Sequence, residues 1–207
     1  MIRNVVFDIG GVLLRLRYQP FIEYLGGAGI DMTNLPRWLE QVDLAAHERG
    51  EITGDELLGR IAAMAREPLD PHELQERWLD MFDQAQEMFA LAAGLRDEYR
   101  VFLLSNIGDL HWHHLNARYA FDDLTHGVIA SFRVGAIKPS AAIYRATERQ
   151  FGLEPAATVF IDDLPQNVAG AQACGWRAIH HRDPTETRRQ LRALGVRLPV
   201  PFAEAGA

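Results

Sequence analysis

The stretch Val5-Val6-Phe7-Asp8-Ile9-Gly10-Gly11-Val12-Leu13 decides the fold of this chain. It opens with three consecutive apolar residues, which is typical of a strand buried on both faces, as in a parallel sheet. Similar short apolar runs follow at residues 101–104, 128–130 and 158–161, with a weaker one at 177–179. We therefore expect a parallel sheet whose first strand ends just before Asp8.

Helical patterns separate these runs. The predicted helices cover roughly residues 86–99, 109–119, 139–151 and 165–174, and Gly175 follows the last of them as a C-cap. Because strands and helices alternate, the predicted fold class is α/β, a doubly wound parallel sheet with a Rossmann-like core.

Residues 15–85 interrupt this alternation. The segment has almost no β-branched runs and carries two helix-start signals, a capping box from Thr53 to Glu56 and the pair Asp70-Pro71. Its apolar residues recur at helical spacing, so its helices are expected to pack on one another. We predict a core domain formed by residues 1–14 and 86–207, and a small helical cap domain, residues 15–85, inserted after the first strand.

Composition and charge limit the classes of partner. Of the 207 residues, 48% are hydrophobic, and 21 basic against 28 acidic residues give a net charge of −7. This balance argues against nucleic acid and against an anionic membrane surface. No apolar run is long enough to span a bilayer. The lone cysteine, Cys174, suits a reducing compartment, so we expect a cytoplasmic protein. We also expect the tail, residues 199–207, to be loosely held.

Polar residues stand where the predicted strands end. They are Asp8, Ser105-Asn106 and Asp162-Asp163. In an open parallel sheet, ligands bind beyond the carboxyl ends of the strands. Three carboxylates that meet there repel one another unless a cation lies among them, and hard oxygen ligands favour Mg²⁺. Lys138 is the fixed cation in this pattern, and it is suited to holding an anion.

Four motifs, in order and spacing, resemble those of the haloacid dehalogenase-like hydrolase superfamily: the stretch around Asp8, Leu103-Leu104-Ser105-Asn106, Lys138-Pro139 and Phe160-Ile161-Asp162-Asp163. The insert after the first motif resembles the helical-cap subclass. Residues 47–53 and the Asp-x-Gly form of the first motif resemble the branch with bacterial α-D-glucose-1-phosphate phosphatases and the phosphatase domain of soluble epoxide hydrolases.

The resemblance implies a role for each of these residues. It makes Asp8 the nucleophile that takes the phosphoryl group. Ser105 and the Asn106 backbone would bind phosphate oxygens, and Lys138 would neutralise both the phosphate and Asp8. The resemblance also implies a Mg²⁺ ion bound by four groups: Asp8, the Gly10 carbonyl, Asp163 and, through water, Asp162.

The first motif departs from the family pattern at Gly10. The family usually has a second aspartate there, which acts as general acid on the leaving oxygen and then as base on water. Loss of a positioned acid or base typically costs ~10²–10⁴-fold in rate. Slow turnover, a good leaving group or a substitute group must make up the difference. An anomeric sugar hydroxyl is a comparatively good leaving group, which makes sugar 1-phosphates chemically sensible.

Each histidine or charged residue singled out beyond these motifs has a purely structural explanation as an alternative to a functional one. His47 and Arg49 lie in the insert, so they either select the substrate or are ordinary helix-end charges. His111 and His114 share a helix face, but no acidic or cysteine ligand follows in pattern, which favours packing over metal binding. Cys174 is expected to be a small core residue.

The sequence thus predicts a Mg²⁺-dependent phosphatase acting on a small phosphorylated metabolite, for example a hexose 1-phosphate. A dehalogenase is the alternative among enzymes, since its first motif also lacks the second aspartate. That reaction needs no metal, so the Asp162-Asp163 pair favours the phosphatase. The third reading is a catalytically weak phosphate-binding protein, for which Gly10 is the support. The sequence does not indicate the oligomeric state.

Overall fold

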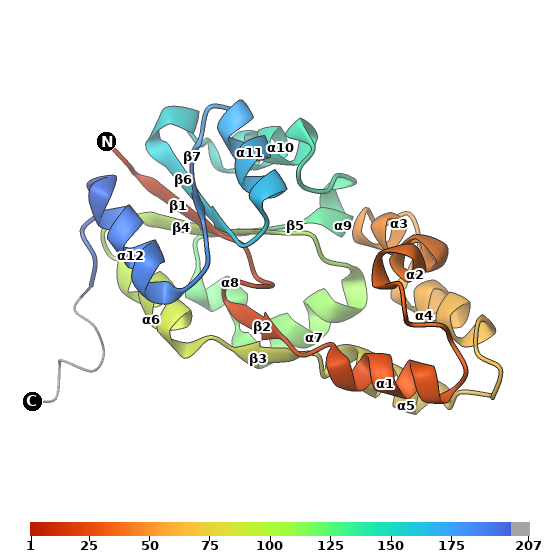
Figure 1. Cartoon of the computed structure of the whole chain (residues 1–207). Coiled ribbons are helices and arrows are strands. Elements are labelled where there is room, and N and C mark those ends of the chain that lie inside the picture. Colours follow the sequence, from red (N-terminus) through yellow and green to blue (C-terminus); the bar gives the residue numbers. More distant parts are fainter. Residues whose placement is uncertain (200–207) are drawn as a thin grey trace, which may run out of the picture.

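A five-stranded parallel sheet forms the centre of the computed structural model, which describes residues 1–199 (Figure 1). The strand order is β5-β4-β1-β6-β7. The strands are β1 (Asn4–Phe7), β4 (Arg100–Ser105), β5 (Val128–Ala130), β6 (Thr158–Asp162) and β7 (Arg177–His180). β1 is the central strand, with Val5 paired to Val101 on one side and to Val159 on the other. The predicted parallel α/β sheet is confirmed. The predicted tail lies almost wholly in residues 200–207, outside the described residues.

Helices cover both faces of this sheet (Figure 1). Even-numbered β1 and β4 residues such as Val6 and Phe102 pack with α10 (Ala141–Phe151), α11 (Pro165–Ala173) and Cys174. Odd-numbered residues such as Val5 and Leu103 pack on the other face. The helices there are α6 (Gln86–Leu95), α7 (Asp109–Tyr119), α8 (Phe121–Leu124) and α12 (Pro184–Ala193). Both faces are apolar because both are buried, which explains the continuous apolar runs.

Element ends differ slightly from the sequence prediction. α6 ends at Leu95, not at Tyr99, and α10 begins at Ala141 after the N-cap Ser140, not at Pro139. α11 ends at Ala173. Three short elements of the core were not predicted: α8, α9 (Ser131–Val134) and the 3-10 turn η1 (Pro155–Ala157). α12 was also missed, although Asp183 caps it and Pro184 begins it.

The segment between β1 and α6 contains five helices and a hairpin. The helices are α1 (Gln19–Gly27), α2 (Leu35–Val42), α3 (Leu44–Glu48), α4 (Gly54–Ala63) and α5 (Pro71–Leu79). The hairpin pairs β2 (Leu14–Leu16) with β3 (Phe82–Gln84) in antiparallel fashion, so both ends of the helical segment leave the core side by side. The helices agree with an inserted cap. The division at residues 14/15 and 85/86 stays a prediction, and the hairpin at that division was not foreseen.

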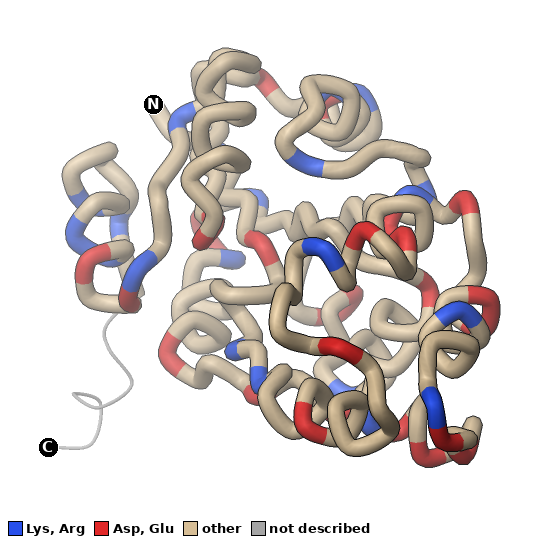
Figure 2. Tube along the Cα trace, turned by 45° about the vertical axis from the view of Figure 1, so that its right-hand side comes forward, with Lys and Arg blue, Asp and Glu red and all other residues tan. Residues whose placement is uncertain are grey.

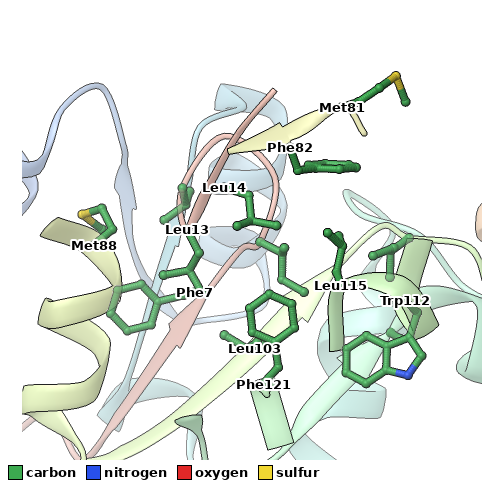
Figure 3. Close-up of a cluster of buried hydrophobic side chains, with 14 of the residues drawn as sticks. Phe7, Leu13, Leu14, Met81, Phe82, Met88, Leu103, Trp112, Leu115 and Phe121 are labelled. Carbon is green, nitrogen blue, oxygen red and sulfur yellow. The ribbon is translucent and has the colours of Figure 1, made fainter. Parts of the chain in front are cut away.

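Cap and core share one hydrophobic cluster. Phe21, Trp38 and Leu57 of the helical segment belong to the same buried cluster as Phe7 and Leu103 of the sheet. Figure 3 shows part of this cluster, where side chains from β1, the following turn, the hairpin and α7 converge. The apolar contacts therefore hold the helical segment against the carboxyl edge of the sheet.

Charge is dispersed over the described chain, with basic and acidic residues interspersed along the trace (Figure 2). Within residues 1–199 no helix combines the length and the hydropathy needed to cross a membrane.

His111 links α7 to the cap. Its ring stacks on Trp78 at 4.7 Å between centroids, and Phe82 packs edge-on against it at 4.9 Å. Its Nε2 donates a hydrogen bond of 2.7 Å to the Trp78 carbonyl. Burial lowers the pKa of His111 to about 4. The packing role expected for His111 agrees with this geometry.

Neutral His111 should stabilise the folded protein above pH ~6.5, its unfolded pKa, and that stability should be lost as the pH falls toward its folded pKa of about 4. The loss amounts to up to about 3 kcal/mol, at ~1.4 kcal/mol per pKa unit. Urea unfolding at about pH 7 and about pH 4 should show a smaller fall in unfolding free energy for His111→Gln than for the parent. His113→Gln is the matched control, because His113 is exposed on the same helix. Equal falls for parent and His111→Gln would contradict the assignment.

Candidate active site

A tight turn after β1 positions Asp8. The Asp8 N–H donates to the Ile161 carbonyl on the neighbouring strand, and the Asp8 Oδ1 accepts from the Ile9 N–H at 2.7 Å. The turn closes where the N–H groups of Leu13 and Leu14 both donate to the Ile9 carbonyl. The carboxylate is therefore oriented by the backbone, and it is 6% exposed.

Three carboxylates meet at this edge of the sheet, as the sequence predicted. Oxygen atoms of Asp8, Asp162 and Asp163 all lie within 4.8 Å of one another. Gly11 permits the approach, because it has a φ of +75° and a Cβ at this position would collide with the Asp163 carboxylate. At Gly10 the φ is not in that region, and a Cβ would meet only Leu16 Cδ1, at 3.8 Å. The absolute requirement for glycine is therefore at the second position of the pair.

Lys138 lies between two of these carboxylates. Its Nζ is 2.7 Å from Asp8 Oδ2 and 2.7 Å from Asp162 Oδ2, and its side chain is 1% exposed. Burial alone would lower the pKa of Lys138, but Asp8 and Asp162 together raise it. The amine is therefore held as a cation within reach of any anion that enters beside Asp8.

Asp162 is fully occupied by protein donors. Its Oδ1 accepts from the Leu164 N–H at 2.8 Å and from Asn167 Nδ2 at 3.0 Å, while Asn167 Nδ2 also lies 3.2 Å from Oδ2. With Lys138 on Oδ2 as well, the carboxylate has donors on both oxygens. Its direct contacts thus orient Lys138 and the start of α11, while Asp163 is left with a freer carboxylate.

Asn106 fixes the backbone of Lys138. Its Oδ1 accepts from the Lys138 N–H at 2.8 Å, and its Nδ2 donates to the Lys138 carbonyl at 3.1 Å. The side chain of Asn106 is thus engaged, which leaves its backbone for an anion. Ser105 follows at the end of β4, and its hydroxyl lowers the pKa of the Asp8 carboxyl group.

Negative charge exceeds positive charge among these groups. Burial raises the pKa of Asp8, and Asp162 raises it further, while Lys138 and Ser105 oppose the shift. Burial and Asp162 also raise the pKa of Asp163. One lysine against three carboxylates leaves the cluster short of positive charge, so its oxygen donors fit a hard divalent cation.

The end of α3 contacts the core close to these residues. The Ser131 hydroxyl donates to the Glu48 carbonyl at 2.6 Å, and the Gly54 N–H donates to Asp109 Oδ1 at 3.0 Å. Gly50 faces the Phe132 carbonyl, and Gly108 faces the His47 ring, so closely that a Cβ at either glycine would collide. Residues 47–54 are thus held against the core largely through backbone atoms.

The structure separates His47 and Arg49, the two residues predicted to select the substrate. His47 is 1% exposed and lines the cavity beside Asp8, whereas Arg49 forms an ion pair of 2.7 Å with Glu51 and is not among the residues that line it. Between them, Glu48 does line the cavity. Its signal in the sequence was its place next to His47. Burial raises the pKa of Glu48 to about 7, against the lowering influence of Lys138.

Asp8, Lys138 and Asp163 lie at one end of a cavity of about 420 Å³ between the sheet edge and the cap helices. Ser105, Asn106 and Gly10 also line it. The volume is in the range of small-molecule sites. The four predicted motifs thus converge on a single cavity.

Comparison with known proteins identifies the family. A family model described as haloacid dehalogenase-like hydrolase matches residues 2–175. The chain belongs to this family of hydrolases, and the family predicted from the motifs is confirmed.

Two curated relatives and one solved structure extend the comparison. A D-ribitol-5-phosphate phosphatase of Bacteroides thetaiotaomicron is 25% identical and covers 94% of this chain and 98% of its own. A sesquiterpene phosphatase of Aspergillus oryzae is 26% identical, with 93% and 96% covered. The crystal structure of a family enzyme of B. thetaiotaomicron, in complex with magnesium and inorganic phosphate, is 27% identical. It has a TM-score of 0.79 and covers 88% of this chain and 95% of its own.

Gly11→Ala should lower the free energy of unfolding by several kcal/mol, since a left-handed conformation costs ~1–2 kcal/mol for alanine and the new Cβ must displace Asp163. Gly10→Ala is the matched control and should cost less than about 1 kcal/mol, since the space there is open. Urea unfolding of both variants checks the difference. Equal destabilisation would show that the approach of Asp163 does not depend on Gly11.

Proposed function

We propose that this chain is a Mg²⁺-dependent phosphatase that hydrolyses a small phosphorylated metabolite through an aspartyl phosphate on Asp8. The observation that carries the proposal is the buried contact of 2.7 Å between Asp8 Oδ2 and Lys138 Nζ, beside the Asp163 carboxylate in a cavity of small-molecule size. The names of the two relatives, both phosphatases, and the magnesium and phosphate in the related structure support it.

In this mechanism an Asp8 oxygen forms a bond to phosphorus as the bond from phosphorus to the ester oxygen breaks, and the alcohol leaves with a proton. A water molecule then attacks phosphorus, which releases inorganic phosphate and restores the Asp8 carboxylate. Lys138 neutralises charge on the phosphoryl oxygens, and the Ser105 hydroxyl and the Asn106 backbone would bind them.

The donor set described above would hold Mg²⁺ through Asp8, Asp163 and the Gly10 carbonyl, with Asp162 acting through water. When bound, the ion would offset the repulsion between the carboxylate and the phosphate. Asp162 contributes through the chain itself, by keeping Lys138 in place.

The relatives leave the substrate open. One is named for a polyol phosphate and the other for a sesquiterpene phosphate, so family membership is compatible with alcohols of opposite polarity. The hexose 1-phosphate expected from the sequence has a comparatively acidic leaving group, and the polarity of the cavity decides between such an ester and an apolar one.

Two other functions are tested by measuring phosphate release with and without Mg²⁺. A dehalogenase would release halide from a haloacid without added metal. A phosphate-binding protein would bind phosphate and turn over none of the esters. Phosphate release that depends on Mg²⁺ supports the phosphatase over both.

Asp8→Asn should abolish phosphate release, by more than ~10⁴-fold, while it leaves the fold intact, because the amide keeps the shape but is no nucleophile. Phosphate release is measured at saturating Mg²⁺, and circular dichroism provides the control for folding. A folded variant with parental activity would rule out the covalent mechanism.

Asp163→Asn should raise the Mg²⁺ concentration needed for half-maximal activity by at least ~10-fold, because a direct ligand is lost. Asp162→Asn should lower kcat with a smaller shift in that concentration, because Asp162 acts on Lys138. Metal titrations of the two variants make the comparison. Superimposable curves would show that the two carboxylates are equivalent toward the metal.

A further inference from the structure

The cavity has two chemically different halves. The charged groups gather at the end next to Asp8. The other half is lined by apolar side chains that come from the helical segment, including the loop between α1 and α2, and from α7: Ile22, Met32, Leu35, Leu39, Leu44 and Leu115. These two halves match a ligand with an anionic head and an apolar body.

The apolar half offers few hydrogen-bond partners. Trp38, Trp78 and His47 line the cavity, but the two indole N–H groups and the His47 Nε2 are buried without a partner, and the His111 Nε2 is already bonded to a carbonyl. A sugar or polyol would bring a hydroxyl group on nearly every carbon. Each hydroxyl left unpaired there would cost about 1–3 kcal/mol. The few polar atoms of this lining cannot satisfy a row of hydroxyl groups.

The entrance to the cavity is apolar as well. Apart from Met1, the large hydrophobic residues that stand exposed in the described chain are Leu16, Tyr18 and Leu164. All three line this cavity. Leu16 lies in the hairpin, Tyr18 just before α1, and Leu164 at the start of α11. Exposed apolar side chains gathered from three segments at one opening indicate a surface that contacts an apolar ligand.

We propose that the substrate is the phosphate monoester of an apolar alcohol, with an aliphatic chain or an aromatic ring, and not of a sugar or polyol. The proposal rests on the phosphatase function above for the head group. The body of the substrate lies in the apolar half of the cavity, and its phosphate reaches Asp8 and Lys138.

The test compares kcat/KM for ethyl, butyl and octyl phosphate, below their micelle-forming concentrations, with that for ribitol 5-phosphate and glucose 1-phosphate. Burial of a methylene group contributes ~0.8 kcal/mol, so kcat/KM should rise up to about fourfold per methylene until the apolar half is full. Equal or higher kcat/KM for ribitol 5-phosphate or glucose 1-phosphate than for octyl phosphate would overturn the proposal.

Binding separates this proposal from the phosphatase function. Calorimetry on the Asp8→Asn protein with octyl phosphonate should show a negative heat-capacity change and tighter binding than with ethyl phosphonate. If octyl phosphonate binds in this way while the parent hydrolyses no ester, the phosphatase function fails and the apolar site stands. If esters are hydrolysed but the two phosphonates bind equally, the apolar site fails alone.

Leu39→Gln places a polar group in the apolar half on a helix that glutamine tolerates. It should lower kcat/KM for octyl phosphate at least ~10-fold, because one apolar contact with the chain is lost. The value of kcat/KM for ethyl phosphate should stay nearly unchanged, because this ester is too short to reach Leu39. Leu69→Gln is the matched control, because Leu69 lies in the cap and does not line the cavity. A similar loss for both substrates in Leu39→Gln would overturn the placement of the chain.

A second inference concerns the proton that Gly10 cannot supply. The titratable groups lining the cavity are Asp8, Tyr18, His47, Glu48, His111, Lys138 and Asp163. Lys138 is bonded to two carboxylates, His111 is bonded to a carbonyl, and Tyr18 stands at the entrance. Burial lowers the pKa of His47, so little of its imidazole is protonated at neutral pH. Glu48 is left as a carboxyl group without another assigned role, and its backbone is fixed to Ser131.

We infer that Glu48 is the general acid and base of the reaction. Its carboxyl group gives a proton to the ester oxygen as the bond from that oxygen to phosphorus breaks. Its carboxylate then takes a proton from the water that attacks the aspartyl phosphate, which returns Glu48 to its starting form.

Glu48→Gln should lower kcat/KM for octyl phosphate by ~10²-fold or more, since kcat/KM includes the departure of the alcohol. For p-nitrophenyl phosphate, whose leaving group needs no proton, the loss should be far smaller. Gly10→Asp in the Glu48→Gln background should restore part of the rate on octyl phosphate, because it returns a carboxyl group to the first motif and a Cβ at Gly10 meets only Leu16. Glu51→Gln, on the same segment but paired with Arg49, is the control. Equal losses on the two esters, or no rescue by Gly10→Asp, would overturn the role of Glu48.

Discussion

The ammonium group of Lys138 between Asp8 and Asp162 is the interaction on which the rest of the site depends. Two buried carboxylates at the ends of adjacent strands repel each other, because burial weakens the screening of their charges. With Lys138 at 2.7 Å from both, the pair becomes a single ionic cluster. Removing one member of such a cluster leaves a buried charge without compensation, which is costly.

Much of the surrounding structure holds this cluster in place. Asn106 bonds to both backbone polar groups of Lys138, and Asn167 and the Leu164 N–H hold Asp162. These residues come from the ends of β4 and from the start of α11, on either side of the central strand. The parallel sheet therefore brings distant parts of the sequence to one point with defined orientation, as expected at the carboxyl edge of such a sheet.

The sequence was most informative where burial imposes a pattern. Strands buried on both faces must be apolar throughout, so four of the five strands were readily found, and the motifs at their ends identified the family. The hairpin of β2 and β3 escaped because each strand has three residues and they pair across about 70 positions of chain. The proposed role of Glu48 escaped for a similar reason: its backbone bond to Ser131 spans 83 residues, and no local pattern predicts such a contact. The missed helix α12 is a different case, because a local signal for it was present. Asp183-Pro184 starts this helix in the same way as Asp70-Pro71 starts α5.

The contact between residues 47–54 and the core has a consequence for how this protein can change over evolutionary time. The Glu48 carbonyl, the Gly50 backbone and the Gly54 N–H make the contact, so most side chains of the segment do not hold it together. Leu35, Leu39 and Leu44, which line the cavity, likewise lie on helices separate from the ionic cluster. Mutations of these leucines can alter the shape and polarity of the cavity while the chemistry at Asp8 is inherited unchanged. Relatives with the same core can therefore diverge toward alcohols of very different polarity through the cap alone.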